Sequence, residues 1–381
     1  MIERINILQM PIKNYFKQID LFLILIIIAL TAIGVLAISS ATAYSGDDSL
    51  VRKQIIHFVV GLVLMIIVMS IDYHMLGDWY LVIYGITVVM LIAVFFIGKN
   101  VNGAARWIMI GNQQIQPSEF AKISMILCGA KLIDNYQKKI NALWPILIIG
   151  LFEFIPFILI NRQPNLSTSI VLIIILVIQL FVTKLNIRYI LTTVVIGIII
   201  VSSAFVYIVK SPNQKLIASY QRDRIVNKII GGDNLAERYQ TNQAIHAIGS
   251  GGLEGKGLYK GSISQLNYLP ESHNDFIIAV VGEEFGFIGA TVVIALILIF
   301  IARGFWIAHA AIDDFGKLIV VGYIGMIAMQ SFVNMGVVTD LLPNTGIPIP
   351  FISYGGSSLW ANMMGMGLVL NVAMSKEETM F

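Results

Sequence analysis

One aspartate is a candidate catalytic group, because it lies where a polar loop meets a long apolar run. Asp275 ends the segment Leu-Pro-Glu-Ser-His-Asn-Asp, and mostly apolar residues follow it. A carboxylate in such a half-dry position keeps a proton more readily than one in water, which suits a general base. The position also suits an N-terminal helix cap, and spacing alone leaves both readings open. Glu271 and His273 of the same segment are candidate substrate-binding residues.

A pair of opposite charges forms a second candidate group. Glu119 and Lys122 are three residues apart and follow Pro117-Ser118, which predicts a helix start. On a helix they share one face. They are either a mutually satisfied structural ion pair or the charged wall of a polar cavity. Arg106, in Gly-Ala-Ala-Arg-Trp, adds a positive charge shortly before them.

Two further segments are rich in turn-forming residues. The string Arg-Gln-Pro-Asn-Leu-Ser-Thr at 162–168 is by itself a capped helix start. Segment 341–358 holds three prolines and several glycines, so it breaks any helix. Irregular backbone near membrane depth persists only where it is buried in protein or lines a cavity. We therefore expect this loop beside a polar cavity, with Ser353 and Tyr354 as candidate substrate contacts; no histidine and cysteine cluster has metal-ligand spacing.

The elements that must position these residues are membrane-spanning helices. Hydrophobic residues make up 57% of the 381-residue chain and charged residues only 12%, against roughly 25% in soluble domains. The apolar runs are unbroken rather than alternating, which argues for helices and against a β-barrel. A net charge of +3 gives no argument for nucleic acid. The sequence predicts an all-α polytopic membrane protein with about ten spans, at 20–40, 54–71, 79–98, 118–134, 143–161, 166–183, 189–209, 274–302, 317–338 and 355–374.

Lysines and arginines give the orientation. If the N-terminus is cytoplasmic, the short inside segments hold eleven of these residues and the short outside segments hold five. Inside segments carry the excess in membrane proteins. We therefore expect both termini in the cytoplasm, and the candidate site residues at the outer face.

The largest connection is an extracytoplasmic loop at about 210–273, between the seventh and eighth spans, and the chain is otherwise one transmembrane domain over 1–381. Asn234 and Glu237 resemble a helix-start box, and glycines from Gly249 on are expected to end that helix. The loop is net basic, so it is either a solvated surface loop or a cap that attracts anionic lipid headgroups or a pyrophosphate.

Taken together, these strings resemble the SEDS family (shape, elongation, division and sporulation), which includes RodA, FtsW and SpoVE. The resemblance runs in order from the first span to the tenth. It rests on Gly-Ala-x-Arg-Trp, Gln-Pro-Ser-Glu-x-x-Lys, Gly-Ser-Gly-Gly-Leu at 249–253, Pro-Glu with Asp-Phe at 270–276, and Pro-Phe-Ile-Ser-Tyr-Gly-Gly at 350–356. Two positions depart from the family pattern: Asn165 replaces an aspartate, and Asp340 replaces a glycine.

The resemblance implies a peptidoglycan glycosyltransferase in the bacterial cytoplasmic membrane. Such proteins polymerise the undecaprenyl-linked disaccharide-peptide lipid II and work with a class B penicillin-binding protein and other elongation or division proteins. The family's essential aspartate falls on Asp275, and its outer-cavity residues match Arg106, Glu119 and Lys122.

An inverting transfer from an α-linked pyrophosphate donor needs one base, and positive charge for the leaving group. We expect Asp275 to be the base. Arg106, Lys122 and the basic loop, especially Arg222 and Arg224, are candidates for the charge. No cofactor is certain; a divalent cation, Mg²⁺ or Mn²⁺, remains open. A lipid II flippase and a non-catalytic scaffold for the penicillin-binding protein are the alternatives. The sequence does not separate elongation from division or sporulation.

Overall fold

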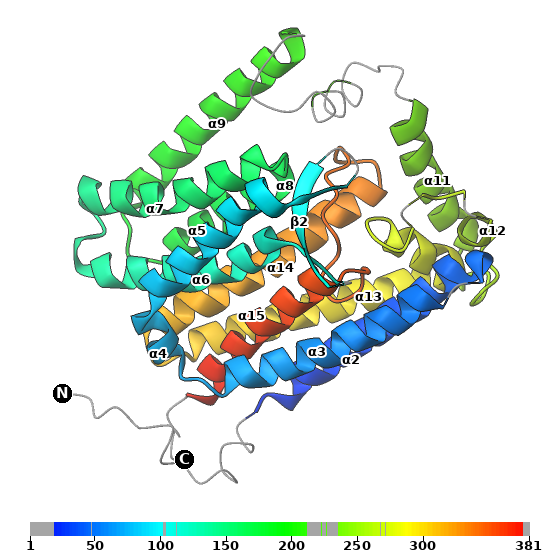
Figure 1. Cartoon of the computed structure of the whole chain (residues 1–381), viewed down its shortest axis with the longest axis horizontal. Coiled ribbons are helices and arrows are strands. Elements are labelled where there is room, and N and C mark those ends of the chain that lie inside the picture. Colours follow the sequence, from blue (N-terminus) through cyan, green and yellow to red (C-terminus); the bar gives the residue numbers. More distant parts are fainter. Residues whose placement is uncertain are drawn as a thin grey trace.

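A helix lies at each of the ten predicted spans (Figure 1). The computed structural model describes residues 19–46, 48–101, 104–111, 113–211, 222, 226, 235–266, 268–270 and 272–375. The ten helices are α2 (Leu21–Thr42), α3 (Ser49–Met69), α5 (Tyr80–Ile97), α6 (Pro117–Tyr136), α7 (Leu143–Arg162), α8 (Leu166–Phe181), α9 (Ile187–Lys210), α13 (Ile277–His309), α14 (Asp314–Val338) and α15 (Gly356–Met374).

Six of these helices, among the described residues, are long and apolar enough to cross a membrane: α2, α3, α5, α7, α13 and α14. The polytopic helical class is therefore confirmed, while the number of crossings stays a prediction. The helices differ in depth. In its most apolar window α14 is 78% buried and α5 only 17%, so α14 is central and α5 peripheral. The exposed Ile, Leu and Val side chains of α3, α5 and α7 form an apolar surface suited to lipid.

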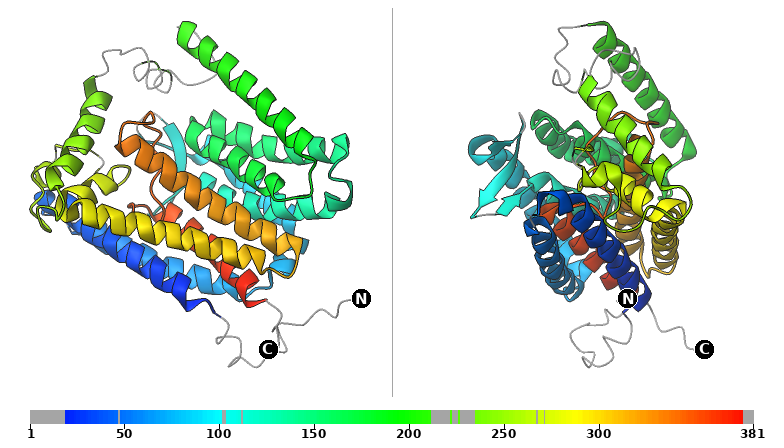
Figure 2. Two further views of the ribbon diagram at one scale, coloured as in Figure 1. Left: turned by 180° about the vertical axis from the view of Figure 1, so that it is seen from behind. Right: turned by 90° about the vertical axis from the view of Figure 1, so that its right-hand side faces the viewer.

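Alternate connections gather at opposite ends of the bundle (Figures 1 and 2). One end carries the short helix α4 (Tyr73–Asp78), the start of α14 and the last turn of α15. It is called here the α4 end. The other end carries segments 99–116, 162–165, 235–276 and 339–355, and is called the loop end. This arrangement agrees with the predicted alternation of the chain between two sides.

The loop end contains a small sheet that was not predicted. Strands β1 (Lys99–Val101), β2 (Ala104–Ile110) and β3 (Gln113–Ile115) pair antiparallel in that order. Ile110 pairs with Gln113, and Gly111 between them has φ 60°. Positive φ at this place favours glycine. The expected all-α fold is therefore all-α apart from this sheet, which carries Arg106.

The described part of the large loop contains the helix that the sequence predicted. Helix α11 (Leu235–Gly251) ends in the glycine-rich string, as expected, and Asn234 of the helix-start box lies outside the described residues. Gly252 follows with φ 56°, the left-handed conformation that glycine allows after a helix. A short helix, α12 (Ser262–Gln265), packs beside α11 and α2.

Helix α13 is broken at Gly286, where φ is 65° and ψ is −161°. The break separates the carbonyls of Glu283 and Glu284 from the N–H groups of Phe287 and Ile288, their ordinary i+4 partners. Segment 252–257 supplies replacements for all four groups. Lys256 N donates to Glu283 O at 3.0 Å, Gly257 N to Glu284 O at 2.9 Å, Phe287 N to Gly252 O at 2.9 Å and Ile288 N to Leu253 O at 3.1 Å. The loop thus satisfies the buried backbone that the break exposes.

Candidate functional site

Asp275 lies at the loop end, one residue before the N-cap position of α13, which Phe276 occupies without a side-chain cap. The Asp275 side chain is partly buried. Its Oδ2 lies beside Gly346 of the proline-broken loop: a Cβ on that glycine would be 3.5 Å from Oδ2. The carboxylate therefore faces the proline-broken loop.

The proline-broken loop, residues 339–355, is folded against helices from several sides. Ile349, Phe351 and Ile352 are at most 3% exposed. Gly34 of α2 packs so closely that a Cβ there would lie 2.4 Å from Ile352 O. Gln54 of α3 donates to Ser353 O at 3.3 Å and accepts from Gly355 N at 3.3 Å. The second half of this irregular backbone is therefore largely buried in protein, while its place beside a polar cavity stays a prediction.

Glu119 and Lys122 form the ion pair that their spacing predicted, with 2.8 Å between Lys122 Nζ and Glu119 Oε2. The pair is more deeply buried than expected: Lys122 is 1% exposed and Glu119 5%. It lies in the first turns of α6, whose start is defined by Pro117. Two charges at this depth stabilise each other, and neither is tolerated alone.

Arg106 extends from strand β2 to the turn between α7 and α8. Its Nε donates to Gln163 O at 3.2 Å, and its guanidinium also donates to Pro164 O. Gln163 in turn donates to Leu91 O of α5 at 2.8 Å. The arginine thus fastens the small sheet to this turn and holds a positive charge beside the start of α8.

Asn165, the first departure from the family pattern, uses both halves of its amide. Its Oδ1 caps α8 by accepting from Thr168 N at 3.3 Å, and its Nδ2 donates to Ser118 Oγ at 3.3 Å. A carboxylate could make the cap but could not donate to the serine. Ser167 donates to Thr345 O. The start of α8 therefore links the ion pair on α6 to the loop beside Asp275.

Several helices begin at the loop end, so their positive ends lie at this end of the bundle. Among the described residues, α6, α13 and α15 begin there without a side-chain cap, and Asn165 caps α8. Ser357 in the first turn of α15 accepts from Gln116 N at 3.0 Å and donates to Gln114 O at 3.1 Å. Uncapped N–H groups and the helix dipole favour an anion.

Three predicted residues support the Asp275 segment directly. Tyr354 N donates to His273 O at 3.0 Å, and the two rings make an edge contact with 5.8 Å between centroids. Ser353 Oγ donates to Asn274 O at 2.7 Å and accepts from Ile349 N at 3.0 Å. These contacts fix the positions of His273, Ser353 and Tyr354, whose role in binding substrate stays a prediction.

The other predicted residues are not joined to this group by the described contacts. Arg222 donates to Ile208 O at 2.9 Å and Val209 O at 3.3 Å, so it caps the last turn of α9. Arg224 and Glu271 lie outside the described residues. Glu283 accepts from Lys256 Nζ at 2.7 Å and from Ser264 N at 3.0 Å. These bonds hold Lys256 and α12 against α13.

The sequence analysis missed Asn334, a buried polar residue of α14. Its Nδ2 donates to Asp275 O and to Ile347 O, at 2.8 Å each. The available signal was an asparagine inside an apolar span, where polar side chains are costly and usually have a purpose.

Known proteins were compared with this chain. The model of a family of cell cycle proteins, comprising FtsW, RodA and SpoVE, matches residues 20–378. This chain belongs to that family. Stage V sporulation protein E of Bacillus subtilis strain 168 is 37% identical over 364 residues, which covers 93% of this chain and 96% of the relative. Peptidoglycan glycosyltransferase MrdB of Escherichia coli K12 is 35% identical over 368 residues, which covers 94% and 95%.

Solved structures of the family share the fold. A structure describing how a peptidoglycan synthase complex coordinates polymerization and crosslinking gives a TM-score of 0.80 at 28% identity, and covers 93% of this chain and 97% of the matched one. The crystal structure of the rod shape determining protein RodA from Thermus thermophilus gives 0.70 at 27% identity, and covers 94% and 98%. The helical bundle of this SEDS protein is therefore the family fold.

Proposed function

We propose that this SEDS protein is a peptidoglycan glycosyltransferase that polymerises lipid II into β-1,4-linked glycan strands. Membership of the family and the names of the relatives support the reaction class. The observation that carries the site assignment is the continuous set of contacts at the loop end, from the Glu119–Lys122 pair through the start of α8 to the loop beside Asp275.

The proposed step is one inverting displacement. The Asp275 carboxylate takes the proton of the 4-hydroxyl of the acceptor sugar. The freed oxygen attacks the donor sugar C1 on the face opposite the pyrophosphate and forms the new C1–O bond. The bond between C1 and the pyrophosphate oxygen breaks, and its electron pair leaves with undecaprenyl pyrophosphate.

The leaving group needs positive charge rather than a strong acid. We assign this role to Arg106, Lys122 and the uncapped helix starts of α6, α13 and α15. Each helix N-terminus is equivalent to about half a positive charge. His273, Tyr354 and Ser353 are assigned to sugar or peptide contacts beside the base, together with Glu271.

A divalent cation would share the charge of the pyrophosphate. The described residues contain no group of three or more His, Cys, Asp or Glu side chains that could hold a metal. Mg²⁺ commonly binds through one or two carboxylates and substrate phosphates instead, and Asp275 is one carboxylate among the described residues at this end. We expect chelation to lower turnover and Mg²⁺ or Mn²⁺ to restore it.

The test is polymerisation of lipid II by the purified protein, with and without its class B penicillin-binding protein, and with glycan chains resolved on a gel. Asp275→Asn keeps the side-chain shape and removes the base, so turnover should fall about 10²–10⁴-fold. Asp340→Asn is the matched control, because Asp340 is an exposed aspartate at the same end of the molecule; it should leave turnover unchanged.

Three results would contradict the proposal in different ways. Near-wild-type turnover of Asp275→Asn removes the base assignment. Lipid II crossing vesicle membranes without chain formation indicates a flippase. Chain formation that depends only on the partner, and persists with Asp275→Asn, indicates a scaffold.

The orientation is proposed as well: both termini are cytoplasmic and the loop end faces outward. The single cysteine, Cys128, is fully buried, so background labelling by a membrane-impermeant thiol reagent should be low. A cysteine introduced at Asp340 should label in intact cells, and one introduced at His309 only after permeabilisation. The opposite pattern would reverse the assigned sidedness.

A further inference from the structure

Three consecutive carbonyl groups before α13 are held by three separate donors. His273 O accepts from Tyr354 N at 3.0 Å, Asn274 O from Ser353 Oγ at 2.7 Å, and Asp275 O from Asn334 Nδ2 at 2.8 Å. The first two donors belong to the proline-broken loop. Only the third comes from a regular helix, α14, in the centre of the bundle.

Asn334 uses its amide in an unusual way. Both Nδ2 hydrogens are used, one for Asp275 O and one for Ile347 O. The residue is 1% exposed, and within the described ranges its buried Oδ1 has no hydrogen-bond partner. An unpaired buried acceptor is costly. The asparagine at this position is therefore explained by its two donated hydrogen bonds rather than by core packing.

The two carbonyls that Asn334 holds belong to two segments that meet at the Asp275 carboxylate. One belongs to Asp275 itself. The other belongs to Ile347, the residue after Gly346, and a Cβ built on Gly346 would lie 3.5 Å from Asp275 Oδ2. One rigid side chain therefore fixes both the backbone from which the carboxylate extends and the loop that faces it.

We propose that Asn334 is a positioning residue for Asp275, and this inference rests on the proposed role of Asp275 as the base. Removing the amide frees the Asp275 peptide and the 346–347 segment to move relative to each other. The carboxylate keeps its charge but loses its alignment with the acceptor hydroxyl. A misplacement of about 1 Å costs on the order of 10²-fold in rate, so the loss should appear in kcat rather than in KM for lipid II.

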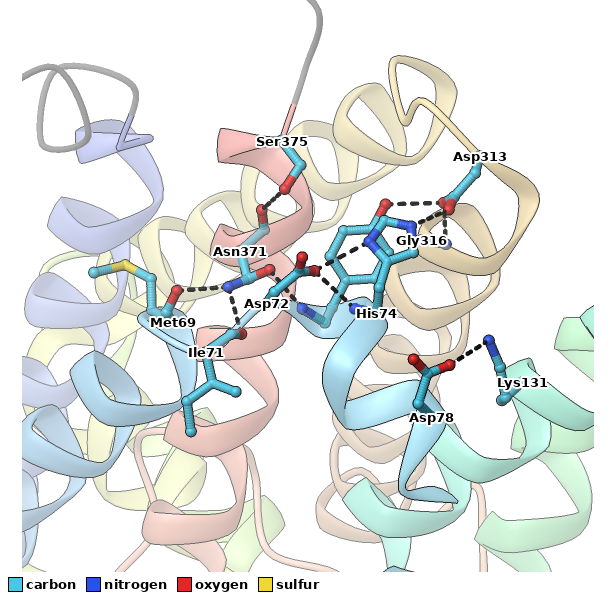
Figure 3. Close-up of polar contacts among 11 residues, drawn as sticks. Met69, Ile71, Asp72, His74, Asp78, Lys131, Asp313, Gly316, Asn371 and Ser375 are labelled. Carbon is cyan, nitrogen blue, oxygen red and sulfur yellow. Dashed lines mark hydrogen bonds and ion pairs between the residues drawn. The ribbon is translucent and has the colours of Figure 1, made fainter. Parts of the chain in front are cut away.

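A matched control is needed, because any buried asparagine contributes to folding. Asn371 of α15 provides it. It is also 1% exposed, and its Nδ2 also donates to two backbone carbonyls, Met69 O at 2.6 Å and Ile71 O at 2.8 Å. These contacts lie at the α4 end (Figure 3), opposite the candidate site. Asn371→Ala should therefore lower stability without changing turnover per folded molecule.

The experiment compares Asn334→Ala, Asn334→Ser, Asn371→Ala and Asp275→Asn in the full-length protein with its partner. Tm and folded fraction come from melting and size exclusion, and kcat and KM from lipid II consumption. We expect Asn334→Ala to lower kcat by about 10- to 100-fold with KM within about twofold. Asn334→Ser keeps one donor and should recover part of kcat. Asn371→Ala should share the loss of Tm only.

Wild-type kcat in folded Asn334→Ala, or an equal kcat loss in Asn371→Ala, overturns the inference. If Asn334→Ala does not fold, the milder Asn334→Ser, which keeps one hydroxyl donor in place of the two amide donors, decides the question. A lower kcat at constant KM then supports positioning, and wild-type kcat overturns it. Activity retained by Asp275→Asn refutes the base assignment instead, so the two failures are distinguishable.

Discussion

The buried pair of Glu119 and Lys122 gives the sharpest test of how charge is used at the loop end. Its two readings, structural ion pair and substrate contact, predict different results in a double-mutant cycle. The variants are Glu119→Gln, Lys122→Met and the combination of both. Each replacement is close in size to the residue it replaces, so charge is the main change.

The burial of the pair sets the expected magnitude. With Lys122 1% and Glu119 5% exposed, removing either partner leaves a charge without compensation in a poorly hydrated site. Such a change costs about 3–5 kcal/mol in soluble proteins. The combined variant leaves no buried charge, so it should recover most of that loss, and its cost should be far smaller than the sum of the two single costs. Melting in detergent measures the stability of all three variants.

Turnover of the combined variant then separates the readings. If Lys122 helps to hold the pyrophosphate, the stable double variant should still polymerise lipid II poorly, with a raised KM for the donor. Wild-type kcat and KM in that variant would refute the substrate contact and leave a purely structural pair. Equal stability of the two single variants and the wild type would refute the burial argument itself.

Three further predictions concern stability. The hydrogen bond to Asp313 raises the pKa of His74. Burial alone would raise the pKa of Asp313, but the hydrogen bonds that it accepts from His74 and neighbouring groups outweigh burial and lower its pKa. A histidine with a raised pKa contributes stability that is complete below its ordinary value of 6.5 and is lost as pH rises through the raised value. The Tm should therefore fall as the pH rises above 6.5, and less so in His74→Gln; parallel profiles would contradict this. Gly286→Ala places a Cβ 2.4 Å from a backbone nitrogen of the inserted loop at positive φ, so it should cost at least about 1–3 kcal/mol, whereas Gly85→Ala, in open space, should not lower the Tm. Asp340→Gly should raise the Tm by relieving up to about 1–2 kcal/mol of left-handed strain, because position 340 has φ 60°; an unchanged or lower Tm would contradict this.

The sequence predicted the helices well because a lipid-facing helix needs a long apolar run, and few other structures produce one. It missed the sheet at 99–115, whose strands are short and adjoin two spans. The Gly-Asn pair at 111–112 of the sequence was the available signal. The break at Gly286 was also missed, because a glycine in an apolar run has many uses and its partner loop lies about 30 residues away in the chain.

Site residues were predictable where their neighbours in sequence are their neighbours in space. The pairing of Glu119 with Lys122 follows from helix geometry. The support of Asp275 by Asn334 spans 59 residues, and no local pattern indicates it. The structure explains the first departure from the family pattern, but only the usual glycine, not the aspartate, at the second. Asn165 gains a donor to Ser118, and Asp340 occupies a left-handed position after α14, where glycine is the usual residue.

The loop inserted into the break of α13 also limits how the gene can vary in length. Each of four backbone groups at the break depends on a specific residue of segment 252–257. Inserting or deleting one residue there shifts every pairing and leaves buried polar groups unmatched, each at a cost of about 1–3 kcal/mol. Insertions and deletions should therefore be absent from 251–257 across related sequences and concentrate elsewhere in the large loop. For the same reason, an epitope tag or fluorescent fusion placed within 251–257 should prevent the protein from folding.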